Sequence, residues 1–352
     1  TLFRSIDRLS RIPAIMEMPY NDIIRKFIDM YAGRLRNQVS FMLSACNFYM
    51  PIFEEALDAY GLPLELRYLP IIESALNPSA VSRAGASGLW QFMIGTGKIY
   101  GLESNSLVDE RRDPIKATWA AARYLKEMYD IYGDWNLVIA AYNCGPGTIN
   151  KAIRRANGET DYWKIYNYLP KETRGYVPAF IAANYVMTYY CDHNICPMET
   201  NIPASTDTVQ VNKNLHFEQI ADLCNVPLDQ IKSLNPQYKK QMIPGDSKPY
   251  TLRLPIDAIS TFIDKQDTIY AHRADELFRN RKTVAVKEIT PSTRKTTTAV
   301  AGKGKLTYYT IKSGDTLSTI AGKYGVTIKD IQRWNGMSNT KIAAGKRLKI
   351  YK

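Results

Sequence analysis

Apolar side chains recur at helical spacing from residue 21 to about residue 190. Ile24, Phe27, Ile28 and Tyr31 lie three and four residues apart, and later segments repeat this spacing. No run of alternating apolar and polar residues, as a half-buried strand would have, interrupts the pattern. The sequence therefore predicts an all-helical N-terminal domain.

Glycine and proline residues divide this helical region into segments. Helices tend to begin just after a proline or an Asp-Pro pair and to end at a glycine. The punctuation predicts helix starts after Gly61-Leu62-Pro63, after Asp113-Pro114 for a helix over 115–132, after Gly133-Asp134 and after Pro170.

The C-terminal part contains two copies of a repeat, one hundred residues apart. The matching positions are Ile220-Ala221, Val226, Ile231 and Asn235 in the first copy and Ile320-Ala321, Val326, Ile331 and Asn335 in the second. In the second copy a short strand is followed by a Gly314-Asp315 turn and an apolar stripe that begins at Leu317. Gly325 suits a helix end, and Thr327 with Asp330 suits the start of a second helix. A closing strand completes a predicted βααβ unit.

The two copies are separated by segments of different character. Residues 257–281 are predicted to be helical and charged, and residues 290–305 are rich in Thr, Lys, Ser and Gly without periodicity. We therefore expect domains over 1–200, 205–258 and 306–352, joined by a helical and basic linker over 259–305.

The composition of the chain says more about its possible binding partners than about its activity. The chain has 352 residues and a formal net charge of +12, which favours contact with an anionic polymer such as nucleic acid, a membrane surface or a cell wall bearing carboxylates. Charge alone does not choose among them. No apolar run approaches the roughly 20 residues that span a bilayer, so we expect a soluble form, with any signal peptide or lipid anchor upstream of Thr1.

Cysteine spacing leaves two interpretations open. There are five cysteines, and Cys191 and Cys196 are close enough for a local bridge or could remain two thiols. A metal site at this pair, with His193 between them, has no second ligand cluster, so no metal is expected. Cys46 and Cys224 lie in apolar helical patterns and are predicted to be core residues.

One carboxylate stands within a long ordered signature. Residues 73–93 contain, in order, Glu73-Ser74, Pro78, Ser82, Gly85-Ala86, Gly88-Leu89, Gln91 and Met93. Further on, Ala141 to Gly147 reads A-Y-N-C-G-P-G. Both segments, in this order, resemble the catalytic signature of soluble-type lytic transglycosylases, with Cys144 in place of the usual alanine. The resemblance implies a lysozyme-like helical fold.

The resemblance implies a specific chemistry for Glu73. In that family one glutamate acts first as acid toward the MurNAc-GlcNAc oxygen and then as base toward the C6 hydroxyl of the same MurNAc, giving a 1,6-anhydro ring. Most glycosidases use two carboxylates, whereas this signature supplies one. The apolar residues 69–72 would raise the pKa of Glu73, as an acid requires. The alternative is a surface glutamate at a helix end.

The family pattern also assigns roles around Glu73. Ser82 and Gln91 would hydrogen-bond the substrate or orient Glu73, and Met93 would pack near the sugar. Gly85 and Gly88 are expected to permit tight turns and close backbone approach. For Met93 a position in the hydrophobic core is the alternative.

Three residues further along the chain complete the expected site. By resemblance, Tyr142 and Asn143 would position the N-acetyl group or stabilise positive charge at the anomeric carbon. Tyr176 would approach the carboxyl of Glu73. For Asn143 the alternative is a helix cap.

The second repeat copy closely resembles a LysM domain. In that family the glycan-binding groove lies between two loops, which here contain Gly314, Asp315, Thr316 and Leu317 in one and Ile342 in the other. Backbone groups would read the N-acetyl groups, while Asp315 and Thr316 could instead serve as helix caps. The first copy departs from the pattern at residues 213–217, so its fold is expected and its glycan binding is left open.

These observations lead to a mainly α fold: an all-helical lysozyme-like catalytic domain followed by small βααβ LysM domains. The expected protein is an exported bacterial lytic transglycosylase of the cell envelope, periplasmic or at the outer membrane. The LysM units would tether it to peptidoglycan strands. No cofactor or nucleic acid is expected, while outer-membrane anchoring through an upstream segment and the oligomeric state are left open.

Two alternatives remain. A hydrolase related to goose-type lysozyme would need a second carboxylate to activate water, for which Asp109, Glu110 and Asp113 are candidates by sequence proximity. A cell-wall scaffold with an idle catalytic domain is the other. Intact Glu73 and Asn143 argue against it.

Overall fold

The structure is a computed structural model that describes residues 2–200, 202–203, 205–278, 288, 306–312, 314–337, 339–340 and 342–351. It divides into two units, Thr1–Ile289 and Thr290–Lys352. The predicted basic linker at 290–305 lies outside the described residues.

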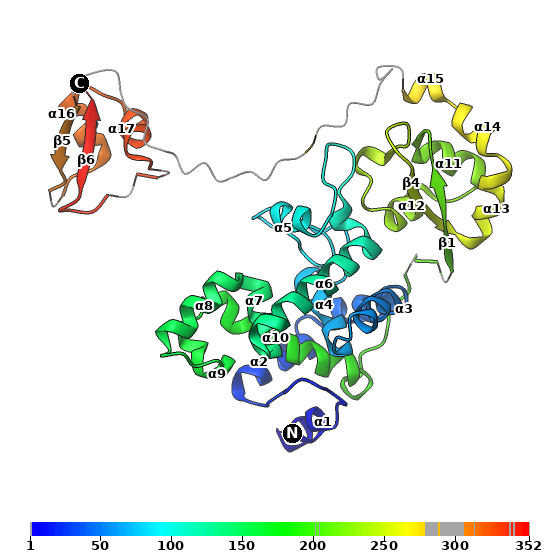
Figure 1. Cartoon of the computed structure of the whole chain (residues 1–352), viewed down its shortest axis with the longest axis horizontal. Coiled ribbons are helices and arrows are strands. Elements are labelled where there is room, and N and C mark those ends of the chain that lie inside the picture. Colours follow the sequence, from blue (N-terminus) through cyan, green and yellow to red (C-terminus); the bar gives the residue numbers. More distant parts are fainter. Residues whose placement is uncertain are drawn as a thin grey trace. The chain divides into compact units, whose positions relative to one another are not determined.

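The N-terminal domain is helical, as predicted (Figure 1). Its helices are α1 (Leu2–Ser10), α2 (Asp22–Ala32), α3 (Arg36–Ala59), α4 (Leu69–Ser74), α5 (Ile94–Ile99), α6 (Pro114–Tyr132), α7 (Trp135–Cys144), α8 (Pro146–Arg155), α9 (Tyr162–Ile165) and α10 (Lys171–Thr188). The 3-10 turns are η1 (Leu64–Tyr68), η2 (Glu110–Arg112), η3 (Tyr166–Tyr168) and η4 (Cys191–His193). Over described residues 2–200 the extended pairing is confined to isolated bridges, such as Val81–Ser87 and Ser87–Phe92.

Capping residues explain where these helices begin and end. The Asp113 carboxylate accepts hydrogen bonds from the backbone N–H groups of Ile115 and Lys116 at the start of α6. Gly133 closes the same helix in the left-handed conformation, with φ of 62°. The helix predicted after Asp113-Pro114 is therefore confirmed.

The core of this domain surrounds α10, which packs against α2, α4 and α7. Trp90 is fully buried and lies edge-on to Phe53 of α3. Its indole N–H donates to Thr118 Oγ1 of α6 at 2.9 Å. The segment that precedes Trp90, between α4 and α5, is thereby fixed against the helices.

The first repeat copy is a small α/β domain joined to the helical domain within the first unit. Its elements are β1 (Thr206–Val211), β2 (Asn214–His216), α11 (Phe217–Cys224), α12 (Leu228–Leu234), η5 (Lys239–Gln241), β3 (Met242–Pro244) and β4 (Tyr250–Pro255). β1 pairs antiparallel with β4, and β2 with β3. Helices α13 (Ile256–Asp264), α14 (Gln266–Ala271) and α15 (Ala274–Leu277) follow, as the helical pattern predicted. Phe262 and Ile269 are buried in the core of this copy.

The second copy has the predicted βααβ order. Its elements are β5 (Leu306–Thr310), α16 (Leu317–Tyr324), α17 (Ile328–Asn335) and β6 (Arg347–Tyr351). β5 and β6 pair antiparallel, with Tyr308 opposite Lys349. Thr327 and Asp330 form the expected capping box, and Gly325 ends α16 in the left-handed conformation. The core comprises Ile311, Leu317, Ile320, Ala321, Ile331, Trp334, Leu348 and Ile350.

All five cysteines are free thiols. Cys191 and Cys196 are exposed and unbridged, which decides between the two interpretations of their spacing. Cys224 is buried as expected, and Cys46 is half-buried. The described residues contain no cluster of three or more His, Cys, Asp or Glu that could hold a metal. Within the described parts of the chain, no helix combines the length and apolar content that crossing a bilayer requires.

Candidate active site

Glu73 lies in the last turn of α4, where the chain makes a sharp bend. Ala75 and Leu76 follow with φ of 52° and 59°, the left-handed region that ends the helix. The Ser74 hydroxyl bonds to the carbonyls of Pro70 and Leu89, each at 3.0 Å. The end of α4 is therefore tied to the following loop, residues 80–92, which we call the cleft loop.

Glu73 lines a cavity of about 420 Å³. The cavity is lined by Tyr31, Leu35, Gln38, Met42, Ile71, Ile72, Glu73, Ser74, Ala75, Ala80, Val81, Ser82 and Gln91. Glu73 is the one carboxylate among these lining residues. The apolar wall and the single acid give a setting in which the proton on Glu73 is stabilised.

The pKa of Glu73 is raised to about 7. Burial is the largest cause, because desolvation disfavours the charged carboxylate. The Tyr176 hydroxyl donates a hydrogen bond to Glu73 Oε1, which lowers the pKa, and the negative charge of Glu172 raises it. Glu73 can therefore hold its proton near neutral pH and still release it, as an acid that later acts as a base must.

Tyr142 and Asn143 lie at the end of α7, near Glu73. The Tyr142 hydroxyl donates to the Trp90 carbonyl at 2.7 Å, and Asn143 Oδ1 accepts from the Thr173 hydroxyl at 2.9 Å. Burial first, and then the charge of Glu73, raise the pKa of Tyr142 well above its ordinary value. Both side chains are held in place by the fold, and the Oδ1 of Asn143 bonds to α10 rather than capping a helix.

Ser82 and Gln91 line the cavity, and their side chains form hydrogen bonds within the cleft loop. Ser82 Oγ accepts from the Ala86 N–H at 3.0 Å, while Gln91 Nε2 donates to the carbonyls of Gly88 and Ala80 at 2.8 and 3.3 Å. Gln91 has φ of 47°, an unusual value for a residue with a side chain. These residues shape the loop beside Glu73.

Of the expected site residues in the helical domain, Glu73, Ser82 and Gln91 line the cavity, whereas Met93, Tyr142, Asn143 and Tyr176 are not among its lining residues. The Met93 side chain is 45% exposed and lies directly before α5. The core alternative for Met93 is therefore wrong. A glycan contact for Met93 stays a prediction.

One wall of the cavity is formed by residues outside the site predicted from the sequence. Tyr31 of α2 is buried, and desolvation raises its pKa to about 12. Leu35, Gln38 and Met42 continue this wall along α3. Their three- and four-residue spacing was a detectable signal of one helix face, but nothing in it indicated that the face borders a cavity.

The carboxylates considered for water activation are engaged elsewhere. Asp109 is ion-paired with Arg111 at 2.8 Å, Glu110 is ion-paired with Lys116, and Asp113 caps α6. None of the three lines the Glu73 cavity.

In the second copy, the residues expected to form the glycan-binding groove have structural roles. Gly314 has φ of 87°, Asp315 Oδ2 accepts from the Tyr309 hydroxyl and the Lys312 N–H, and Thr316 caps α16. Leu317 is buried, and Ile342 packs against the same core. Thr316 thus acts as the helix cap, whereas Asp315 binds residues that precede the helix, so glycan binding by this loop stays a prediction about its backbone.

Family models match three parts of the chain. The Transglycosylase SLT domain matches residues 50–165, the LysM-like domain of lytic transglycosylase MltD matches 205–271, and the LysM domain matches 309–350. The LysM-like assignment of the first copy, made from its repeat pattern, is confirmed.

Curated relatives match the chain over different shares of its length. Membrane-bound lytic murein transglycosylase D of Escherichia coli (strain K12) is 32% identical over 341 residues, which cover 95% of this chain and 70% of that protein. Soluble lytic murein transglycosylase of the same strain is 33% identical over 124 residues, covering 34% of this chain and 19% of that protein. The crystal structure of the 70 kDa soluble lytic transglycosylase from Escherichia coli aligns with a TM-score of 0.36 and 29% identity, covering 41% of this chain and 24% of that one. The chain belongs to the SLT-type lytic transglycosylase family, in its LysM-bearing form.

Proposed function

We propose that this enzyme cleaves the β-1,4 bond between MurNAc and GlcNAc in peptidoglycan without adding water, leaving 1,6-anhydroMurNAc ends. One observation carries the proposal. Glu73 is the single carboxylate among the described residues that line its cavity, and its pKa is raised to about 7. One group with this pKa can serve as acid and then as base.

Glu73 alone can perform both proton transfers of the reaction. Its proton passes to the glycosidic oxygen as the bond from that oxygen to the anomeric carbon breaks. The C6 hydroxyl of the same MurNAc then attacks the anomeric carbon and gives its proton back to Glu73. The new C–O bond closes the anhydro ring, and the carboxyl is ready for another cycle.

The neighbouring residues support this sequence of steps. The Tyr176 hydroxyl holds one oxygen of Glu73, which leaves the other free to face the substrate. Tyr142 and Asn143 bond to Trp90 and Thr173, and they would position the N-acetyl group or stabilise positive charge at the anomeric carbon. Ser82 and Gln91 would act through the shape of the cleft loop.

The second LysM copy would hold the enzyme on glycan strands through the backbone of the loops at 314–317 and 342–345. Linking this module to the catalytic domain raises the effective substrate concentration. The proposed location is the bacterial cell envelope, in keeping with the membrane-bound relative. Outer-membrane attachment stays a prediction.

A hydrolytic lysozyme-like reaction is the second candidate. It would require a carboxylate opposite Glu73 to activate water. Asp109, Glu110 and Asp113 are ion-paired or engaged as a cap and lie outside the cavity lining. This placement favours transglycosylation.

Mass spectrometry of products from purified peptidoglycan tests the proposal, with the wild-type protein and Glu73→Gln in parallel. Fragments one water lighter than hydrolysis products, absent with Glu73→Gln, are the expected result. Reducing-end products would support the hydrolase. Glycan binding without products from either protein would support an idle scaffold.

A further inference from the structure

A segment of the helical domain is built into the first LysM-like domain. Leu107 and Val108 are 3% and 0% exposed and belong to the same hydrophobic cluster as Phe217 and Tyr238. The backbones also pair: the Asp109 N–H donates to the Gln237 carbonyl at 2.9 Å, and the Lys239 N–H donates to the Leu107 carbonyl at 2.7 Å. The core of the LysM-like domain is thus completed by residues from outside it.

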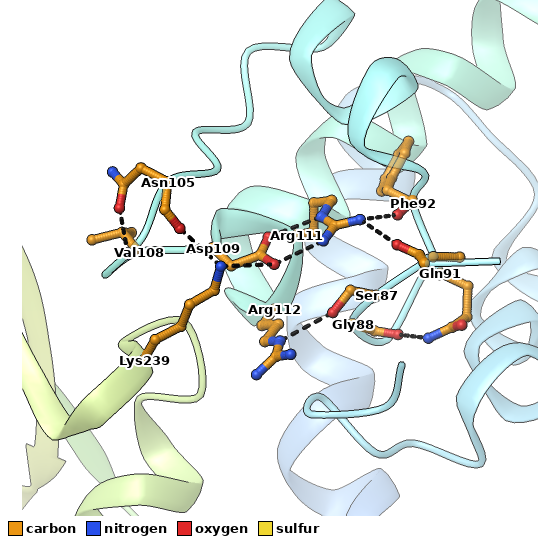
Figure 2. Close-up of polar contacts among 12 residues, drawn as sticks. Ser87, Gly88, Gln91, Phe92, Asn105, Val108, Asp109, Arg111, Arg112 and Lys239 are labelled. Atoms are coloured by element: carbon orange, nitrogen blue, oxygen red, sulfur yellow. Dashed lines mark hydrogen bonds and ion pairs between the residues drawn. The ribbon is translucent and has the colours of Figure 1, made fainter. Parts of the chain in front are cut away.

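A buried ionic network extends from this joint toward the cleft loop (Figure 2). Lys239 Nζ donates to the Asn105 carbonyl at 2.8 Å and lies 3.8 Å from Asp109 Oδ2. Both oxygens of Asp109 accept from the Arg111 guanidinium, at 2.9 and 2.8 Å. The side chains of Asp109 and Arg111 are only 2% and 6% exposed. Such a two-pronged pair fixes the guanidinium plane.

The other edge of Arg111 holds the cleft loop. Its Nη1 group donates to the carbonyls of Gly85 and Phe92, at 2.8 and 2.9 Å. Gly88 packs so closely that a Cβ there would lie 1.7 Å from the Arg111 carbonyl oxygen. Arg112 Nε adds a bond to Ser87 Oγ at 3.0 Å (Figure 2). The loop that contributes Ser82 and Gln91 to the cavity is therefore held by Arg111 and Arg112, which follow closely on the segment that contacts the LysM-like domain.

The first copy also differs from the second at its two groove loops. β2 pairs with β3, and a Cβ at Gly245 would lie 2.2 Å from the Lys213 carbonyl oxygen. Asn214 donates from its backbone and its side chain to Asp246. At Gly345, the counterpart of Gly245 in the second copy, a Cβ would meet no heavy atom within 4 Å among the described residues. In the first copy the loops bind each other.

We propose that the first LysM-like domain is a structural part of the catalytic domain, and that Lys239, Asp109 and Arg111 are positioning residues for the cleft loop. The inference rests on the proposed function for its catalytic consequence. Lys239 supplies positive charge to Asp109 from the LysM-like side, and Asp109 in turn orients Arg111. Loss of that charge should loosen the loop beside Glu73 without removing any group that touches the glycan.

The test compares Lys239→Met with Lys239→Arg in the full chain. Lys232→Met is the matched control, because Lys232 lies in the same domain and pairs with Asp229 on its surface. Lys239→Gln, which keeps a donor for Asn105, replaces the Met variant if that variant does not fold. Two quantities are measured: hydrogen exchange of the Ser82, Ser87 and Gly88 amides, and kcat and KM on short soluble glycans.

We expect Lys239→Met to exchange these amides faster and to lose about tenfold in kcat with little change in KM, since small misplacements near a reacting centre are costly. Lys239→Arg should recover most of the loss, and Lys232→Met should match the wild type. Unchanged exchange in Lys239→Met, faster exchange with unchanged kcat, or an equal loss in Lys232→Met would overturn the inference. A wild-type protein without turnover would instead overturn the proposed function, and the exchange rates would still decide whether Lys239 orders the loop.

Discussion

The Tyr176 hydroxyl donates a hydrogen bond to Oε1 of Glu73, joining α10 to α4 across 103 residues of chain. This bond opposes the effect of burial on the carboxyl, because it stabilises the charged form. The balance of the two leaves the pKa of Glu73 at about 7 rather than higher. The tyrosine therefore acts on both the orientation and the acidity of Glu73.

Replacement of Tyr176 by phenylalanine should change the pH dependence of the reaction. Without the hydrogen bond the pKa of Glu73 rises above about 7, so the acid stays protonated further into the alkaline range. The alkaline limb of the kcat/KM profile should move to higher pH, and the maximal rate should fall by about tenfold because the carboxyl loses its orientation. Rate profiles on soluble glycans between pH 5 and 9 measure both effects.

Tyr162→Phe is the matched control for this comparison. Tyr162 is buried, and its hydroxyl donates to the Arg174 carbonyl at 2.9 Å rather than to Glu73. Its replacement should lower stability and leave the alkaline limb in place. Equal shifts in both variants would argue against a specific role for Tyr176.

Glu73→Gln should be more stable than the wild type at alkaline pH. The pKa of a glutamate is ordinarily 4.5, and that of Glu73 in the fold is about 7, so folding favours the protonated form. The wild-type protein therefore loses stability as the pH rises through this interval, by up to about 3 kcal/mol above pH 7. Glutamine carries no such charge. Calorimetric Tm values at pH 5 and pH 8 should show a gap between the two proteins that widens at pH 8, and a constant gap would contradict the raised pKa.

Gly88→Ala should destabilise the enzyme more than Gly85→Ala. Both glycines have positive φ, 89° and 88°, so alanine is strained at either position by about 1–2 kcal/mol. A Cβ at Gly85 meets no heavy atom within 4 Å, whereas one at Gly88 would lie 1.7 Å from the Arg111 carbonyl oxygen. We expect at least about 2 kcal/mol of additional loss at Gly88 from this overlap. Urea unfolding measures the difference, and equal losses would show that the close packing is not maintained in solution.

Removal of residues 306–352 should separate tethering from chemistry. The second copy has its own core and forms a separate unit of the chain. Its loss should weaken retention on intact sacculi and leave the cleavage of short soluble glycans nearly unchanged. Sedimentation with sacculi and turnover of short glycans are the two measurements. A similar loss in both would exclude a simple tether.

Local sequence signals predicted much of the fold. α6 was expected from Asp113-Pro114 and Gly133, because capping depends on residues within one turn of the helix end. The repeat at a spacing of one hundred residues predicted both LysM-type copies. Glu73 was predicted from the resemblance of residues 73–93 to a family signature, and one glycine of that signature, Gly88, is closely packed in the structure.

Longer-range relations had no such signal. Residues 107–109 pair with residues 237–239. Both segments are short and lack an alternating apolar and polar pattern, so their sequences do not indicate that they pair. Ser82 and Gln91 were expected to face the substrate or Glu73. Short polar side chains in a tight loop also satisfy nearby backbone groups, and the structure gives both of them such partners.

The insertion of Leu107 and Val108 into the LysM-like core has a consequence for synthesis of the chain. The residues that contact this segment lie far downstream in the sequence. Lys239, for example, donates to the Asn105 carbonyl from 134 residues away. During translation the helical domain leaves the ribosome first, with these two side chains uncovered. The contacts of Lys239 with Asn105 and Leu107 can form only after residue 239 has emerged, so on our proposal the cleft loop becomes fully ordered only after the LysM-like domain has been synthesised.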